Sequence, residues 1–345
     1  MIKFQTSILS FEIHSVNYYY PDYLPIFVST RHKPIQLLNG LNDDITSTYN
    51  LLNDKEEFIS PFSLLQFNEY LLVSHVSSLY FINIQNNSHI TKIPLCPTKR
   101  SKNYQKGLIH SIDFNNHYLT CGSLSHSIGF YSLSSPSYPL EILLTDLPSS
   151  VIQLKWLNDD ILLVNFRMFD YLYIYNVNDL SQPVCKLFRP GSTNQKLFFS
   201  VKLNWLCYGD TNGYLNAFNL ALIPDLNSDV SSQNIDESDS ELDLKPNYSF
   251  KLSNYSINSV NFHPNLNIIS ISCGNRIDVT GDSSDSDNDN YDSSNSDNDN
   301  DISDNDSDSD SSTQLVEKSL LPNSKQLQKP NIQLLDMNFL FENNQ

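Results

Sequence analysis

The most informative stretch of this chain is YLTCGSLSHSIGFYS, which runs from Tyr118 to Ser132. Apolar residues alternate with small or polar ones in both halves, and a short polar turn separates the halves, as in two antiparallel β-strands. The pattern occurs six times along the chain. The six copies cover Leu24–Asn39, Tyr70–Asn83, Tyr118–Ser132, Ile161–Asn176, Trp205–Asn219 and Ile268–Asp336.

The copies follow one another at a nearly constant interval. Each copy can be anchored at the last apolar position of its first strand, and the intervals between anchors are then 45, 48, 43, 44 and 65 residues. The anchors are Val28, Val73, Cys121, Val164, Tyr208 and Cys273. Four intervals are close to the period of about 40–45 residues at which a WD-type repeat builds one four-stranded blade. The sequence therefore predicts an all-β chain folded as a WD-type β-propeller.

Further strands flank the copies. The preceding strands are expected at Phe11–Tyr20, Pro61–Phe67, Leu108–Phe114, Val151–Leu157, Leu197–Leu203 and Ile257–His263. The following strands are expected at Ile45–Asn50, Ile90–Leu95, Leu140–Thr145, Val184–Phe188 and Tyr248–Leu252. Only the last copy lacks a following strand, and we expect the remaining N-terminal strand, Ile2–Leu9, to complete that blade and close the ring. This count favours six blades over seven, and a β-sandwich with a tail would not explain the regular period.

The sixth copy is interrupted by a long acidic stretch. Residues 281–310 hold 12 Asp, 9 Ser and 6 Asn, with no Lys or Arg. Such a composition cannot bury enough apolar surface to fold, so we expect residues 278–330 to be a disordered insertion in the last blade. A second acidic loop insertion is expected at residues 221–246. The single propeller domain would then consist of residues 1–277 plus 331–340.

The acidity of the chain is concentrated in these two insertions. The formal net charge is −18 over 345 residues. Outside residues 225–243 and 281–310, however, 20 acidic residues face 21 Lys and Arg. The folded body is therefore expected to be nearly neutral, and the composition does not exclude a nucleic-acid partner.

Two further features bear on the compartment. No apolar run reaches the length of about 18 residues needed for a membrane helix, so no membrane partner is expected. The five cysteines are scattered and form no CxxC pair. Reduced thiols in a cytosolic or nuclear protein are the expected state.

Short motifs within or just before four of the copies, together with the acidic interruption, resemble a known family. The motifs are STRHKPI (Ser29–Ile35), CGS with SIGFY (Cys121–Ser123 and Ser127–Tyr131), TNQKLFF (Thr193–Phe199) and VNFHP (Val260–Pro264). With the interruption after Arg276, they make residues 11–340 similar to the WD-repeat family of the telomerase Cajal-body protein. The closest resemblance is to its fungal relative, a nuclear pre-mRNA splicing factor. The Trp-Asp dipeptide of WD repeats is absent, and pairs such as Tyr175-Asn176 stand in its place.

Motifs of catalysis and of metal binding are missing from the sequence. No GxSxG, HExxH, GxGxxG or phosphate-loop pattern occurs. The eight His show no metal-ligand spacing with a Cys. The run from Asp285 to Asp289 lacks the glycine and glutamate of a calcium loop. We therefore expect a protein that is not an enzyme and has no catalytic residues, metal, cofactor or small-molecule substrate.

Basic residues gather where a propeller places its loops on one face. In each blade, the turn between the second and third strands and the connection to the next blade lie on the same face of the ring. Three residues after the anchor, three of the six copies carry arginine: Arg31, Arg167 and Arg276. Two connections on that face add Lys99, Arg100, Lys102, Tyr104 and Lys106, and Arg189, Asn194, Gln195 and Lys196. Such residues supply phosphate contacts and a base-stacking ring, although turns are also charged simply because they are solvated.

The resemblance and this face predict a nuclear, non-enzymatic, RNA-binding protein of mRNA processing. It would act in pre-mRNA splicing as a monomer within a larger complex, helping a small nuclear ribonucleoprotein (RNA, protein or both) to engage the 5′ splice site. A small-RNA chaperone or trafficking factor of the telomerase or guide-RNA type is one alternative, and a protein-only scaffold is another. The acidic insertion 278–330 is expected to leave the ring on the basic face, where it would either compete with RNA or serve as a solubilising spacer.

Overall fold

The structure is a computed structural model that describes residues 8–13, 23–98, 100–135, 137–223, 243–263, 265–274 and 331–337. All described residues belong to one compact unit. Within this unit the strands form six sheets, which we number as blades 1 to 6 in chain order, and all pairings but one short parallel pair in blade 4 are antiparallel. A single-turn 3₁₀ helix, η2 (Leu220–Leu222), follows the third strand of blade 5.

The blades share one up-and-down strand order. Blade 1 contains β1 (Ile8–Ile13), β2 (Pro25–Thr30), β3 (Ile35–Asn39) and β4 (Ile45–Tyr49); blade 2 contains β5 (Leu64–Phe67), β6 (Tyr70–His75), β7 (Ser78–Asn83) and β8 (Ile90–Pro94). Blade 3 contains β9 (Ile109–Phe114), β10 (Tyr118–Ser123), β11 (Ser127–Ser132) and β12 (Leu140–Leu144); blade 4 contains β13 (Val151–Trp156), β14 (Ile161–Phe166), β15 (Tyr171–Asn176) and β16 (Cys185–Phe188). Blade 5 contains β17 (Phe199–Lys202), β18 (Trp205–Gly209), β19 (Tyr214–Asn219) and β21 (Tyr248–Lys251), and blade 6 contains β22 (Ile257–Phe262), β23 (Ile268–Cys273) and β24 (Asn331–Asp336).

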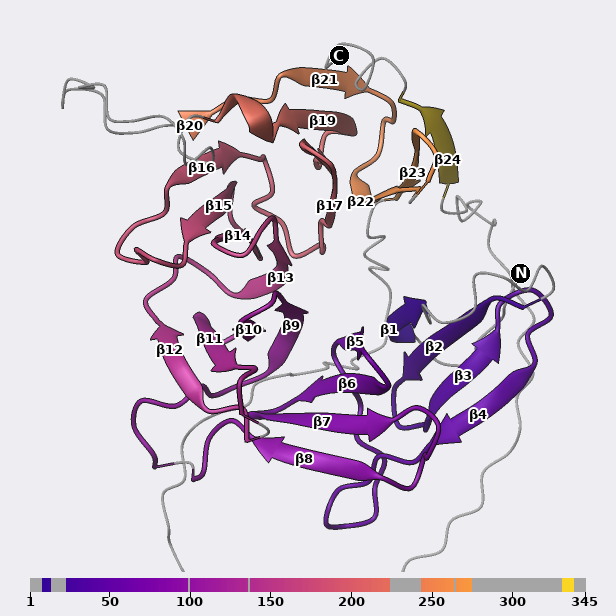
Figure 1. Ribbon diagram of the computed structural model, residues 1–345. Coiled ribbons are helices and arrows are strands. Elements are labelled where there is room, and N and C mark those ends of the chain that lie inside the picture. Colours follow the sequence, from indigo (N-terminus) through magenta and orange to yellow (C-terminus); the bar gives the residue numbers. More distant parts are fainter. Residues whose placement is uncertain are drawn as a thin grey trace, which may run out of the picture. The chain divides into compact units, whose positions relative to one another are not determined.

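The first strands of the blades are the innermost ones. Strand β5 lies against β1 and β9, β9 lies against β13, and β17 lies against β22. Six blades arranged in this way around a centre form a β-propeller (Figure 1). The six-bladed propeller predicted from the sequence is therefore confirmed.

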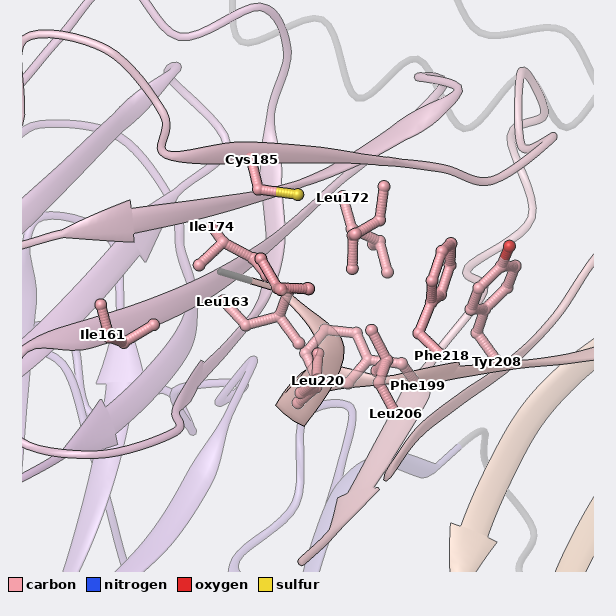
Figure 2. Packing of buried hydrophobic residues seen from close by; sticks show 12 residues of the cluster. Ile161, Leu163, Leu172, Ile174, Cys185, Phe199, Leu206, Tyr208, Phe218 and Leu220 are labelled. Atoms are coloured by element: carbon pink, nitrogen blue, oxygen red, sulfur yellow. The ribbon is translucent and has the colours of Figure 1, made fainter. Parts of the chain in front are cut away.

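Apolar cores lie between neighbouring blades. Figure 2 shows the core between blades 4 and 5, where Leu163, Leu172 and Ile174 of blade 4 face Phe199 and Phe218 of blade 5. Strand alternation produces this packing, because successive side chains point toward the two neighbouring blades in turn. Each fully buried Leu, Ile or Phe contributes about 1.5–3 kcal/mol. Contacts between blades, rather than within them, are thus the main source of stability.

Two glycines allow neighbouring blades to approach closely. A Cβ atom on Gly122 would lie 2.4 Å from Cγ1 of Val151, and a Cβ atom on Gly209 would lie 2.3 Å from the backbone oxygen of Ile257. Both glycines lie near the end of a second strand, and both partners lie at the start of the next blade's first strand. Only glycine fits at these two crossings.

The last blade is completed by a strand that is distant in sequence. Strand β24 pairs antiparallel with β23, from Ile268 opposite Asp336 to Cys273 opposite Asn331. The prediction that the strand Asn331–Asp336 belongs to the sixth copy is confirmed. Residues 275–330, which include the whole of the predicted insertion 278–330, lie outside the described residues.

Two strand predictions differ from the structure. The first strand of blade 1 is Ile8–Ile13, which begins before the predicted strand Phe11–Tyr20, and Ile8 pairs with Thr30 of the same blade. Residues 14–20 lie outside the described residues. The end of the proposed closing strand Ile2–Leu9 therefore belongs to blade 1, and residues 2–7 lie outside the described residues. The error has a physical reason: turn-type residues such as Ser7, Ser10 and Ser15 are scattered through the N-terminal run and do not cluster at one turn, so pairing with β2 sets the position of the strand.

The predicted loop 221–246 also contains ordered backbone at its edges. Residues Asp243–Leu244 form β20, which pairs parallel with β16 as a fifth strand of blade 4.

All five cysteines are free thiols, and Cys96 alone among them is not buried. In the described part of the chain, no helix combines the length and the apolar character needed to cross a membrane.

Candidate nucleic-acid interface

The candidate interface lies on one face of the propeller, which we call the turn face. It carries the turns between second and third strands and the connections that lead into each first strand. Arg31 is exposed in the turn after β2, and Arg167 is half-buried in the turn after β14. Blades 1 and 4, which carry these two residues, are three blades apart in the ring. Arg276, the third predicted arginine, lies outside the described residues.

The connection between β8 and β9 presents basic and aromatic side chains to solvent. Arg100, Lys102 and Lys106 are exposed, and Tyr104 is 42% exposed. Lys99 lies outside the described residues. The connection thus offers cations and a ring at one surface, as predicted, although whether RNA binds there stays a prediction.

A buried glutamine that the sequence analysis did not single out holds this connection in place. Gln105 is 1% exposed, and its Nε2 donates hydrogen bonds to the backbone oxygens of Cys121 (2.7 Å) and Ser127 (3.3 Å). The hydroxyl of Tyr131 donates to Gln105 Oε1 at 3.0 Å. Gly129 makes room for the amide, because a Cβ atom there would lie 2.6 Å from Oε1. Gln105 therefore fixes the backbone between Tyr104 and Lys106.

The second basic connection, between β16 and β17, divides into a buried and an exposed part. Arg189 was predicted to contact RNA, but this prediction is wrong, because the side chain is only 2% exposed. Its guanidinium donates to the backbone oxygens of Phe166 (3.1 Å), Phe169 (3.1 Å) and Leu197 (3.2 Å). Burial lowers its pKa to about 10, opposed by Tyr208 and Asp170. Arg189 therefore serves the structure of the connection, not its surface.

The exposed part of that connection lies beside the start of β17. Asn194 and Lys196 are exposed, and Gln195 is half-buried. The backbone N–H of Gln195 donates to Oγ1 of Thr193 at 3.2 Å, which tightens the turn. Three of the four predicted residues of this connection are thus available at the turn face.

The positive charges of Arg167 and Lys196 influence each other and also act on His110 in the first strand of blade 3. The pKa of Lys196 is lowered, first by partial burial and then by Arg167. The pKa of His110, at the start of β9, falls to about 4 through burial, with Lys196 and Arg167 adding to the shift. His110 was missed because its place near a strand start gained meaning only once β9 was known to be innermost.

A groove lies on the outer part of blade 2. It has a volume of about 500 Å³ and lies between residues 50–59 and strands β6 to β8. Apolar side chains line part of it, and among them Leu52 and Val76 are 44% and 41% exposed. Lys92 closes one side, with its ammonium 5.8 Å from the ring centroid of Tyr80. The groove is therefore mixed in character, with both apolar and basic groups.

Metal-binding side chains are not grouped in the described residues. No set of three or more His, Cys, Asp or Glu there is placed to hold a metal ion.

Comparison with known proteins identifies the fold. No protein-family model matches the sequence, and no curated protein matches it. Among solved structures, the chain is similar to U3-55K, with a TM-score of 0.55 and 12% identity over 79% of this chain and 76% of that one. It is similar to the WD40 repeats of RRP9, with a TM-score of 0.54 and 12% identity over 79% and 75% of the two chains. It is also similar to Raptor from Chaetomium thermophilum, with a TM-score of 0.53 and 14% identity over 77% of this chain but 22% of that one. At these identities the likeness shows the fold alone, which is that of a WD40-repeat β-propeller.

Proposed function

We propose that this protein is a non-enzymatic WD-repeat propeller that binds RNA through its turn face. We further propose that it serves pre-mRNA splicing in the nucleus, by helping a small nuclear ribonucleoprotein to engage the 5′ splice site. The observation that carries RNA binding is the gathering of Arg100, Lys102, Tyr104 and Lys196 on one face of a nearly neutral body. The splicing role rests on the resemblance of the sequence motifs to the fungal splicing factor.

The chemistry of the turn face suits single-stranded RNA. Lysine and arginine contact phosphates without regard to sequence, and an exposed aromatic ring stacks on any base. Tyr104 lies between Lys102 and Lys106, so one short strand of RNA could contact all three. Because Gln105 fixes the backbone at this point, binding would require little ordering of the connection.

The first test is a tagged purification from the native cells, with the recovered RNA sequenced after low-salt and high-salt washes. We expect the small nuclear RNA of the 5′ splice site, and we expect its recovery to fall with salt because phosphate contacts are screened. Recovery of telomerase or guide RNA would instead favour the trafficking role. Absence of any enriched RNA at both salts would contradict RNA binding.

The second test changes the face itself. Arg100→Glu combined with Lys102→Glu reverses two exposed charges, and we expect RNA recovery to fall at least tenfold with unchanged folding. The matched control is Lys92→Glu, which reverses a charge on the outermost strand of blade 2. Equal recovery with the double variant and the control would refute the turn face as the RNA site.

A second candidate function is a protein scaffold. The groove beside Leu52 and Val76 favours it, because exposed apolar side chains around a groove of about 500 Å³ suit an extended peptide. Proteins recovered with the wild-type chain but lost with Leu52→Asp would support this function. Loss of RNA with the same variant would argue against separate sites.

A further inference from the structure

The groove on blade 2 lies between a sheet face and a loop. The connection between β4 and β5 forms the loop side with residues 50–54 and Ile59, and the turn between β6 and β7 adds His75 and Val76. Strands β7 and β8 form the sheet side, where side chains two residues apart point the same way. The groove residues on these two strands are Ser78, Tyr80, Ile90 and Lys92.

The loop side is fixed by its own hydrogen bonds. The backbone N–H of Ile59 donates to the oxygen of Leu51, and that of Asn53 donates to the oxygen of Glu57, both at 2.9 Å. Leu51 and Ile59 are buried in the core that blades 1 and 2 share. The groove is therefore formed before any ligand arrives, and binding would cost little ordering of this loop.

The apolar part of the groove is open to solvent. Leu52 and Val76 are both exposed, although each is held in an isolated β-bridge, to Phe58 and to Leu108 respectively. Exposed apolar side chains that line one groove are typical of an interaction site. A volume of about 500 Å³ is larger than one side chain fills, so the groove suits an extended segment with one apolar anchor.

The groove also carries one unpaired charge of each sign. Lys92 has no carboxylate oxygen within 4 Å, and Asp54 has no cationic nitrogen within 4 Å, in the part of the chain that the structure describes. Asp54 belongs to the loop side and Lys92 to the sheet side. The pKa of His75 is lowered, first by burial and then by Lys92, so its ring is neutral near pH 7 and adds no further charge.

We propose that this groove binds an extended peptide of a partner protein, with an apolar side chain between Leu52 and Val76, an acidic side chain beside Lys92 and a basic side chain beside Asp54. This inference rests on the second candidate function, the protein scaffold, and adds the chemistry of the partner to it. Exposed ion pairs contribute little affinity, but they fix the orientation and the choice of partner. The apolar side chain therefore provides affinity, and the two charges provide specificity.

The test uses a phage-displayed library of random peptides of about nine residues, which span about 30 Å when extended. The library is selected on the immobilised full-length chain. We expect the enriched peptides to share an apolar residue with an acidic residue on one side and a basic residue on the other. Enrichment should be lost on Leu52→Asp, which places a carboxylate in the apolar part of the groove. Leu52 is exposed, so this variant should fold as the wild type does.

A change of charge in the groove provides the sharper measurement. Selection on Lys92→Glu should retain the apolar residue and replace the acidic residue of the peptide with a basic one. The matched control is Lys186→Glu on the fourth strand of blade 4, because the Lys186 ammonium also lies 5.8 Å from a tyrosine ring, that of Tyr173. This control should select the same peptides as the wild type. A selected peptide whose acidic residue is changed to lysine should bind the wild-type chain about fivefold more weakly.

The outcomes separate this inference from the scaffold function. Enriched peptides without a charge preference, or the same preference on Lys92→Glu, would overturn the inference, whereas cellular proteins lost with Leu52→Asp would still support a scaffold. Absence of any enriched peptide on the wild-type chain would also overturn it. A self-association that Leu52→Asp abolishes would assign the groove to a second copy of this chain, and RNA binding that the same variant abolishes would assign it to RNA. Either result would overturn the peptide site.

Discussion

The two ends of strand β9 lie at the same interface between blades 3 and 4, but they use their polar side chains differently. At one end, Asp113 is 6% exposed and accepts a hydrogen bond from the backbone N–H of Trp156 at 2.8 Å. Its carboxylate also lies 3.4 Å from the ammonium of Lys155. At the other end, His110 is 8% exposed, and its one side-chain hydrogen bond among the described residues is to Ile152. The positive charges of Lys196 and Arg167 add to the lowering of its pKa.

Burial therefore does not decide what a polar group does in this interface. Burial raises the pKa of Asp113 and lowers that of His110, so both groups are driven toward their neutral forms. Only Asp113 has an opposite charge and a backbone donor that oppose the shift. Both ends join the two blades, but the His110 ring leaves Nε2 buried without a hydrogen-bond partner among the described residues.

The largest expected effect on stability concerns Arg189, the buried cation in the connection between β16 and β17. Arg189→Met keeps the apolar volume but removes the donors to the carbonyls of Phe166, Phe169 and Leu197. We expect the free energy of unfolding to fall by about 3–4 kcal/mol, because buried carbonyls lose charged partners. Urea titration measures this free energy of unfolding, and Arg100→Met, which replaces an exposed arginine, is the control. A loss below about 0.5 kcal/mol would mean that Arg189 is free to act at the surface after all.

The next largest effect is a dependence of the unfolding free energy on pH, which arises from His110. Its pKa is about 4 in the folded chain and about 6.5 when unfolded, so the unfolded chain binds more protons between these values. Stability from the neutral ring is complete above pH 6.5 and is lost as the pH falls toward 4, by about 3 kcal/mol in total. Unfolding free energies at pH 7 and pH 4.5 should therefore differ less in His110→Gln than in the wild-type chain. In the exposed control His89→Gln, the difference in unfolding free energy between pH 7 and pH 4.5 should match that of the wild type. If His110→Gln also kept the wild-type difference, a group other than His110 would be responsible for the pH dependence.

A smaller effect on stability is expected at the Asp113 end of β9. Asp113→Ala leaves the backbone N–H of Trp156 buried without an acceptor, and we expect a loss of about 2 kcal/mol in unfolding free energy. Asp113→Asn retains an acceptor oxygen and should recover more than half of that loss. Thermal or urea unfolding of both variants distinguishes them. If both lost the same amount, the Lys155 ion pair would matter more than the hydrogen bond.

The smallest effect concerns the connection that carries Tyr104. Gln105→Ala removes the hydrogen bonds to Cys121, Ser127 and Tyr131, and we expect about 1 kcal/mol less stability. RNA affinity should fall as well, because the exposed residues on either side lose their fixed backbone. Hydrogen exchange of residues 100–106 is the direct measurement, and faster exchange is the expected result. Unchanged exchange would show that other contacts hold the connection.

The period of the repeats was enough to predict the propeller and most of its strands. Turn residues such as those around Ser123 and Ser127 mark where each strand ends, so the register follows from local sequence. In the N-terminal run, serines at positions 7, 10 and 15 are scattered and do not form one clear turn, and the start of β1 was therefore misplaced. The near repetition of Ile35–Asn39 and Asn331–Asp336 was a sufficient signal for β24, even across a long insertion.

The candidate site was harder to predict, because a basic residue in a loop has the same appearance in the sequence whether it is buried or exposed. Arg189 and Lys196 belong to one connection, yet the first binds three carbonyls and the second faces solvent. What separates them is how far the connection folds back onto β14, which is a tertiary property. His110 and Gln105 were missed for the same reason, since their roles depend on contacts across blades or strands.

The pairing of β23 with β24 has a consequence for synthesis. The two strands are separated by 57 residues, from position 274 to position 330. At about 5–20 residues per second, a ribosome needs about 3–11 seconds to add that length. During this time the nascent chain already contains five complete blades and the first two strands of the sixth, with the outer edge of β23 unpaired. An unpaired edge is where one nascent chain can associate with another, so we expect slower translation after residue 273 to increase association between nascent chains.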